Sequence, residues 1–212
     1  MQLIGMLDSP YVRRVAVSLQ LLGLPFEHQS ISVFSTFEQF RQINPVVKAP
    51  SLVCDDGTVL MDSTLILDYA ESLAAPGRSL MPTDIGARLQ SLRMIGLALA
   101  VCEKSVQIVY ERMLRPAEKL HQPWVDRVTG QLLAACEALE SALVRRPLML
   151  AGQGIDQASV TTAVAWHFAR TMLPDVLSAQ AFPALQKFSQ QAETLSEFAA
   201  APHGPETYRQ AG

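Results

Sequence analysis

The feature that most constrains the fold of this chain is a change in its hydrophobic pattern near residue 80. Before that point, short β-prone runs alternate with segments of helical spacing. After it, every periodic segment of the 212-residue chain has helical spacing. Alternating strands and helices are typical of a sheet covered by helices, and helices alone are typical of a helical domain. The pattern therefore predicts an α/β part followed by an all-α part.

The first part contains four β-prone runs and three helical segments. The expected strands are residues 2–7, 26–33, 50–54 and 58–60, and the expected helices are residues 12–22, 36–42 and 63–73. A right-handed crossover makes the first two strands parallel. The Asp56-Gly57 pair predicts a tight antiparallel hairpin between the last two. The order β-α-β-α-β-β-α then describes a mixed four-stranded sheet with helices packed on it.

A stretch of turn-forming residues, 75–84, separates this part from the rest of the chain. We expect a first domain over residues 1–78, a linker over 79–85 and an all-helical domain over 86–212. The helical domain should contain four main helices, with prolines between them. These are residues 85–114, 124–143, 158–173 and 184–200.

Composition and charge exclude several classes of protein. The 17 Lys and Arg against 20 Asp and Glu, with no long basic cluster, argue against a nucleic-acid partner. The 3 cysteines show no redox or zinc spacing and the 4 histidines show no metal spacing. The glycines at 152 and 154 lack the third glycine of a dinucleotide fingerprint, so a loop is expected there. With no signal-peptide pattern and no run long enough to cross a membrane, we expect a cytoplasmic protein without metal, nucleotide or membrane contact.

The first candidate functional feature is Ser9-Pro10, at the start of the first expected helix. Serine is a favoured N-cap and proline is favoured at the first helical position. A serine hydroxyl has two lone pairs and one hydrogen, so a capping Ser9 still has a hydrogen to donate to a ligand. A helix N-terminus also favours negative charge, such as a thiolate or a phosphate oxygen. A cap with no chemical role is the alternative.

Two further features follow along the chain. Lys48-Ala49-Pro50 places a proline directly before an interior strand, which makes Ala49-Pro50 a candidate cis peptide bond, with an ordinary edge-strand proline as the alternative. Asp62-Ser63 opens the next helix. Ser63 and its N–H suit a carboxylate and Asp62 suits an ammonium, so the pair suits an amino-acid headgroup, although such pairs also occur as simple caps.

In this order, the three features resemble the thioredoxin-like domain of cytosolic glutathione transferases. The segment N-P-V-V-K-A-P at residues 44–50 is similar to the family's N-P-x-G-x-V-P, and D-S-T-L-I at residues 62–66 is similar to its E-S-x-A-I. The helical second part is similar to the family's C-terminal domain. The resemblance implies a serine-type glutathione transferase, with a thioredoxin-like α/β domain followed by an all-α domain.

The resemblance implies a role for each matching residue. Ser9 would donate a hydrogen bond to the sulfur of glutathione, which is the co-substrate. The backbone of Ala49, before a cis Pro50, would pair with the cysteinyl part, and Lys48 would reach the glycine carboxylate. Asp62-Ser63 would hold the γ-glutamyl amino and carboxylate groups.

Several positions depart from the family's pattern. Val47 stands where a glycine is common, and Asp62 replaces a glutamate. The family's Ser/Thr-x-x-Asp capping box is reversed here, with Asp156 first and Ser159 three residues later, and this order can still satisfy a helix end. Tyr11 is the rival hydroxyl for the sulfur contact, although tyrosine-type members carry their tyrosine nearer the end of the first strand.

The implied reaction is the conjugation of glutathione to a hydrophobic electrophile by a homodimer. The dimer would pair through the helix after Asp62 and the long helix from Ile85. A pocket between the domains would take the electrophile, with plausible walls at Tyr11, Tyr110, Met113 and Leu114, while Trp166 is expected in the helical core. The alternatives are a glutathione-binding stress or interaction protein with little turnover, and a glutathione-dependent peroxidase or isomerase. Arg13-Arg14 is expected on a solvated helix face or in an ion pair between domains.

Overall fold

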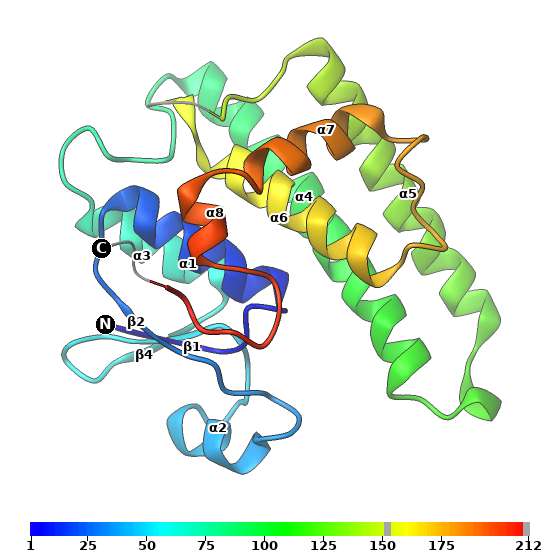
Figure 1. Cartoon of the computed structure of the whole chain (residues 1–212), viewed down its shortest axis with the longest axis horizontal. Coiled ribbons are helices and arrows are strands. Elements are labelled where there is room, and N and C mark those ends of the chain that lie inside the picture. The colour runs from blue at the N-terminus through cyan, green and yellow to red at the C-terminus, as the bar shows by residue number, and fades with distance from the viewer. Residues whose placement is uncertain (151–153, 210–212) are drawn as a thin grey trace. The chain divides into compact units, whose positions relative to one another are not determined.

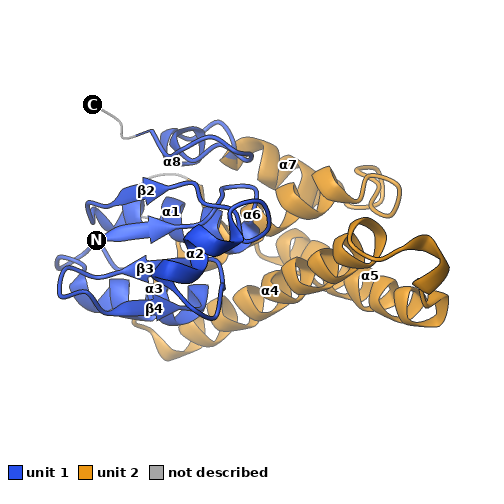
Figure 2. Ribbon diagram, turned by 90° about the horizontal axis from the view of Figure 1, so that it is seen from below, with its two compact units in different colours: residues 1–80, 193–212 blue, residues 81–192 orange. Residues whose placement is uncertain are grey.

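The computed structural model describes residues 1–150 and 154–209 of the chain (Figure 1). The chain forms two compact units, one made of residues 1–80 with 193–212 and the other of residues 81–192 (Figure 2). The expected helical domain extended to residue 212, whereas the last segment of the chain lies with the α/β unit. Of the loop expected at residues 152–154, the first two residues lie outside the described ranges.

The first unit is built on a mixed four-stranded sheet in the order β2-β1-β3-β4. The strands are β1 (Gln2–Ile4), β2 (Glu27–Gln29), β3 (Ser51–Val53) and β4 (Val59–Met61). β1 pairs with β2 in parallel, and the β1–β3 and β3–β4 pairs are antiparallel, as the sequence predicts. β1 is shorter than expected because Gly5 adopts a φ of 133°, at which the chain leaves the sheet.

Helices cover both faces of this sheet (Figure 2). They are α1 (Pro10–Leu22), α2 (Phe37–Ile43) and α3 (Ser63–Leu73). α1 and α3 pack together on the face of the register partners Leu3 and Leu52, both fully buried. Because neighbouring residues of a strand point to opposite faces, Ile4 lies on the other face, where it packs with Phe40 of α2. The α/β interpretation of the first part is therefore confirmed.

The second unit is helical. Its elements are α4 (Ile85–Met113), the 3-10 helix η1 (Ala117–Lys119), α5 (Gln122–Arg145), α6 (Gln157–Met172) and α7 (Pro183–Ala192). α4 packs against α5 and α6, and α7 packs on α5 and α6. Trp166 is 2% exposed and donates to Gln186 Oε1 at 3.0 Å, so it belongs to the core as expected.

The reversed cap of α6 satisfies the helix end. Asp156 Oδ1 accepts hydrogen bonds from the backbone N–H and the hydroxyl of Ser159, both at 2.8 Å. Asp156 Oδ2 accepts a further hydrogen bond from Ser91 Oγ of α4 at 3.2 Å. The Asp-first order therefore caps this helix, as predicted, and also ties it to α4.

The expected final helix over residues 184–200 is wrong, because the chain breaks between α7 and a short α8 (Ser196–Ala200). The guanidinium of Arg13 in α1 contacts the chain at this break and again just after α8. It binds Glu193 through two hydrogen bonds of 2.7 and 2.6 Å and donates to Ala201 O at 2.8 Å. The solvated helix face expected for Arg13 is also wrong, since Arg13 is 1% exposed and its ion pair lies within the first unit.

The tail after α8 returns to the edge of the sheet. Tyr208 N–H donates to His28 Nδ1 at 3.0 Å, while the ring of Tyr208 stacks on Phe26 at 4.5 Å between centroids. Ser30 Oγ donates to Pro205 O at 3.0 Å. Contacts with α1 and with the residues in and beside β2 therefore hold the tail between Ala201 and Tyr208. In the described ranges, no helix has both the length and the apolar character needed to cross a bilayer.

Candidate functional site

The start of α1 presents the hydroxyl of Ser9. Ser9 is the N-cap, and its Oγ accepts a hydrogen bond from Val12 N–H at 3.4 Å, while Pro10 takes the first helical position. The hydroxyl is half-buried, and the capping bond uses only an oxygen lone pair. The preceding Asp8 is a neighbouring acid that the sequence reasoning did not consider. Burial raises the pKa of its carboxyl, with a hydrogen bond from Ser9 N–H acting in the opposite direction.

Gly5 allows the segment around Ala49 to approach the start of α1. A methyl group built on Gly5 would lie 2.7 Å from Val12 Cγ2 and 3.1 Å from Ala49 Cβ, so no other residue fits without a shift of its neighbours. The Ala49–Pro50 peptide bond is cis, as the resemblance implies. The sequence reasoning missed this role of Gly5. The sequence feature that could have indicated this role is a glycine at the end of an apolar strand.

Asn44 organises the loop that carries Lys48 and Ala49. It is 4% exposed, and its Nδ2 donates to Ser51 Oγ at 2.8 Å, while its Oδ1 accepts from Val46 N–H at 3.0 Å. Ser51 Oγ in turn donates to the carbonyl of Lys48 at 2.8 Å. Val47, the position where a glycine is common, has a φ of 52°, in the left-handed region that a β-branched residue rarely adopts. The departure noted in the sequence therefore coincides with backbone strain.

Lys48 and Asp62, two of the predicted glutathione contacts, lie together. Lys48 Nζ is 3.4 Å from Asp62 Oδ2, and their side chains are 51% and 46% exposed. Asp62 Oδ1 also caps α3 by accepting from Thr64 N–H at 2.9 Å. Burial raises the pKa of the Asp62 carboxyl, but the Thr64 hydrogen bond and the charges of Lys48 and Arg14 outweigh it, so the pKa falls below its ordinary value. Asp62 is therefore ionised at neutral pH and available to an ammonium.

Ser63 is bound from behind by a residue that the sequence reasoning left unassigned. Arg14 of α1 is 1% exposed, and its Nη1 donates to Ser63 Oγ at 3.1 Å and to Thr64 Oγ1 at 3.4 Å. The expected solvated face is thus wrong for Arg14 as well. Three features of the first unit now surround the start of α3: the Lys48–Asp62 pair, the Ser63 hydroxyl and a buried cation.

The expected electrophile contacts belong to both units. Tyr11 is half-buried at the second position of α1. Tyr110, Met113 and Leu114 lie at the C-terminal end of α4, with exposed fractions of 44%, 70% and 56%. Their common role remains an expectation.

Other candidate chemistry is limited in the part of the chain that the structure describes. It contains no group of three or more His, Cys, Asp or Glu side chains placed to hold a metal ion. Cys54, Cys102 and Cys136 are buried, and none of them forms a disulfide within the described residues. Burial, together with the charge of Glu137, raises the pKa of the Cys136 thiol to about 12. Since the thiolate is the reactive form, Cys136 is unsuited to nucleophilic chemistry at neutral pH.

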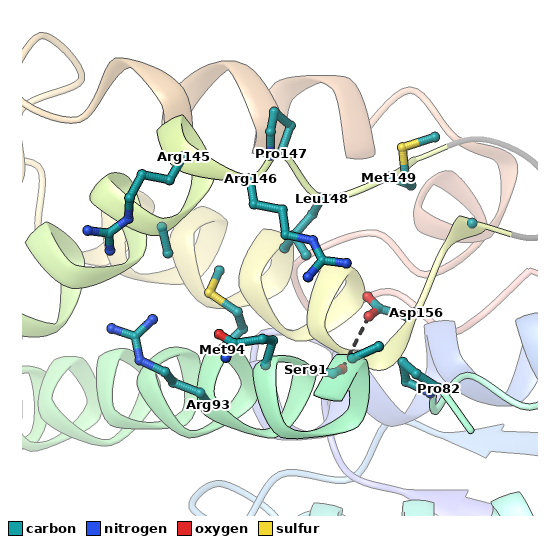
Figure 3. A pocket seen from close by; sticks show the side chains of 14 residues that line it. Pro82, Ser91, Arg93, Met94, Arg145, Arg146, Pro147, Leu148, Met149 and Asp156 are labelled. Carbon is teal, nitrogen blue, oxygen red and sulfur yellow. Dashed lines mark hydrogen bonds between the residues drawn. The ribbon is translucent and has the colours of Figure 1, made fainter. Parts of the chain in front are cut away.

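A separate hollow of about 520 Å³ lies within the second unit (Figure 3). Figure 3 shows the side chains of Arg93, Arg145 and Arg146 around it, with the carboxylate of Asp156 on one side. That carboxylate is already engaged in capping α6. Among the described residues, all those that line the hollow belong to the second unit, and neither Ser9 nor Ser63 is one of them.

Comparison with known proteins agrees with this geometry. Residues 3–78 match the family model described as the glutathione S-transferase N-terminal domain. The chain is 26% identical over 175 residues to the uncharacterized GST-like protein YibF of Escherichia coli K12, covering 82% of this chain and 85% of that protein. It is 26% identical over 141 residues to glutathione S-transferase U4 of Arabidopsis thaliana, covering 61% of each.

A solved structure is similar over the whole chain. It is a glutathione transferase family member from Pseudomonas fluorescens Pf-5 with bound S-(propanoic acid)-glutathione, at 27% identity and a TM-score of 0.79, with 100% of both chains covered. The chain therefore has the glutathione transferase fold. Together with the sequence relatives, this likeness supports its place in the glutathione S-transferase family, with a thioredoxin-like N-terminal domain and a helical C-terminal region.

Proposed function

We propose that this protein is a serine-type glutathione transferase that conjugates glutathione to a hydrophobic electrophile. The observation that carries the proposal is the Ser9 hydroxyl at the N-terminus of α1, which caps the helix through its oxygen and keeps its hydrogen available. The thiolate sulfur of glutathione forms a bond to an electrophilic carbon. That carbon then expels a leaving group with its bonding electrons or, after an addition, its neighbour takes up a proton.

Ser9 would act on the pKa of the thiol. A free thiol, with a pKa of about 8.5, is only a few per cent ionised at pH 7. A hydrogen bond from Ser9 to the sulfur contributes about 1.5–3 kcal/mol and the N-terminus of α1 about 0.3–1 kcal/mol to the thiolate. Each 1.4 kcal/mol lowers the pKa by about one unit, so the two contributions suffice for about one to two units.

The remaining contacts would follow the tripeptide in order. The Ala49 backbone pairs with the cysteinyl part, Lys48 binds the glycine carboxylate, and Asp62-Ser63 holds the γ-glutamyl headgroup. Binding then exchanges the Lys48–Asp62 ion pair for two ion pairs with glutathione. Breaking the Lys48–Asp62 pair costs little free energy, because a pair exposed to this degree contributes at most about 1 kcal/mol.

Two further parts of the proposal concern the electrophile and the oligomeric state. Tyr11, Tyr110, Met113 and Leu114 would contact the electrophile. A homodimer would form through exposed apolar side chains that recur at helical spacing on α3 and on α4, each in its own unit. These are Leu65, Tyr69 and Leu73 on α3, and Ile85, Leu89 and Leu92 on α4. Light scattering after gel filtration tests the dimer, and Leu65→Glu should yield a monomer.

The decisive experiment removes the Ser9 hydroxyl without removing the cap. Ser9→Gly loses the hydroxyl but weakens an N-cap by only a few tenths of a kcal/mol, whereas Ser9→Ala costs about 1 kcal/mol of helix stability. We expect both variants to bind glutathione. The pKa of the bound thiol, measured by ultraviolet titration, should be about one to two units higher than in the wild-type protein. Conjugation of an activated aryl halide at pH 6.5 should be about 10- to 100-fold slower. Ser9→Thr should keep most of the activity.

The rival assignments give different results. Full activity in Ser9→Gly together with an inactive Tyr11→Phe would transfer the sulfur contact to Tyr11. Wild-type protein that binds glutathione but turns over no electrophile would instead favour the alternative of a glutathione-binding protein.

A further inference from the structure

Arg14 is a buried cation placed directly behind the start of α3. Its exposed fraction is 1%, and one nitrogen, Nη1, donates to both Ser63 Oγ at 3.1 Å and Thr64 Oγ1 at 3.4 Å. Burying a guanidinium is unfavourable unless polar groups surround it. Its partners here include the hydroxyls of the first two residues of α3.

These hydrogen bonds fix the direction in which the two hydroxyls donate. A guanidinium has only donors, so Ser63 and Thr64 accept from Arg14 through oxygen lone pairs, and each keeps its own hydrogen for another acceptor. Asp62 Oδ1 already accepts from Thr64 N–H, whereas Ser63 N–H lies in the first turn, where a helix offers it no acceptor. The start of α3 therefore presents hydroxyl and amide donors backed by a positive charge, a combination that suits a carboxylate.

We propose that Arg14 is the positioning residue that makes this site select the α-carboxylate of the γ-glutamyl group. The inference rests on the proposed binding of glutathione and adds a specificity determinant to it. Arg14 acts through Ser63 and Thr64. It orients their hydroxyl hydrogens toward the ligand and supplies a charge of opposite sign at short range.

The neighbouring Arg13 provides a matched control. It lies on the same helix and has the same exposed fraction of 1%, but its guanidinium is bound by Glu193 and by the carbonyls of Phe198 and Ala201. A change at Arg13 therefore removes a buried arginine and perturbs stability without altering the hydrogen bonds of Ser63 and Thr64.

The experiment pairs protein variants with two ligands in calorimetric titrations. The ligands are glutathione and 4-aminobutyryl-cysteinylglycine, which lacks only the α-carboxylate. Wild-type protein should prefer glutathione by at least about tenfold, since a hydrogen bond to a charged group is worth about that factor. In Arg14→Met the preference should fall below about threefold through weaker glutathione binding. Arg14→Lys should give an intermediate ratio, and Arg13→Lys should keep the wild-type ratio.

Kinetics separates positioning from general damage. In Arg14→Met we expect KM for glutathione to rise by at least about threefold, and in Arg14→Lys by less, while kcat at saturating glutathione stays within about twofold in both. An unchanged ligand preference in Arg14→Met overturns the inference. If that variant does not fold, an unchanged preference in Arg14→Lys overturns it equally. Loss of the preference in Arg13→Lys to the same extent also overturns it, because the effect would then belong to the fold. Wild-type protein that binds neither ligand refutes the proposed function itself.

Discussion

The ion pair between Arg13 and Glu193 should be a main anchor of the C-terminal tail, and Glu193→Ala tests it. Arg13 is 1% exposed and Glu193 is 26% exposed, with N–O distances of 2.7 and 2.6 Å in a two-bond arrangement. Removing one partner of a fully buried pair costs about 3–5 kcal/mol, because the other charge is left buried. Since water reaches part of Glu193, we expect a loss of about 2–4 kcal/mol.

This loss should appear first as opening of the tail. Amide hydrogen exchange of residues 196–201 should speed up by at least about 30-fold, because 1.4 kcal/mol corresponds to a factor of ten. If the tail unfolds together with the rest, the urea midpoint should fall by about 1 M, taking an m-value of about 2–3 kcal/mol/M. Exchange measured by mass spectrometry and urea unfolding followed by circular dichroism distinguish these two cases.

The control is Glu38→Ala, the same chemical change in an exposed pair. Arg41 and Glu38 approach to 2.6 Å but are 58% and 69% exposed, so the loss should stay below about 0.5 kcal/mol. An equally small effect of Glu193→Ala on both exchange and unfolding would refute the argument that burial makes this pair important.

Two further predictions concern Gly5 and His28. Gly5→Ala should destabilise the protein by about 3 kcal/mol or more in urea unfolding, because it adds a contact of 2.7 Å to the strain of a φ of 133°. The control is Gly204→Ala, at a φ of 136° with open space around the residue. It should cost only about 1–2 kcal/mol. Equal losses would show that the contacts of Gly5 are unimportant. Burial lowers the pKa of His28, despite a hydrogen bond to the Gly5 carbonyl, and its Nδ1 accepts from Tyr208 N–H. The unfolded chain then binds the proton more readily, so stability should fall as the pH drops below about 6.5 and through the lower folded pKa. Hydrogen exchange at Tyr208 should speed up over the same range, and a His28→Asn variant with the same pH dependence of unfolding would contradict this assignment.

The parts of the fold that could be predicted are those governed by neighbours in sequence. The bounds of α3, residues 63–73, follow from the Asp62 cap and the helical spacing after it, and the hairpin follows from Asp56-Gly57. The cap of α1 at Ser9 and the cap of α6 at Asp156 are equally local, since each bond spans three residues. Local hydrogen bonding depends on residue type and spacing, which the sequence contains in full.

The residues of the candidate site could be proposed from the sequence, but the contacts between them could not. Lys48, Asp62 and Ser63 were recognised from short motifs. That Lys48 binds Asp62 in this structure, and that Arg14 stands behind Ser63, depends on side chains 14 and 49 residues apart in the chain. Such pairings arise only when packing brings the elements together, and no spacing rule predicts them.

By itself, the sequence determined the alternation of strands and helices in the first part, the helical character of the second, and a serine at a helix start. Only the tertiary structure decided the course of the tail and the environment of Arg13-Arg14. The sequence left two alternatives open for both arginines, a solvated helix face or an ion pair between domains, because a charged side chain is ordinarily left in water or paired. Burial of Arg13 requires Glu193, and burial of Arg14 requires the hydroxyl of Ser63 at the start of α3. Both partners are distant in sequence and come within reach only when the chain has packed.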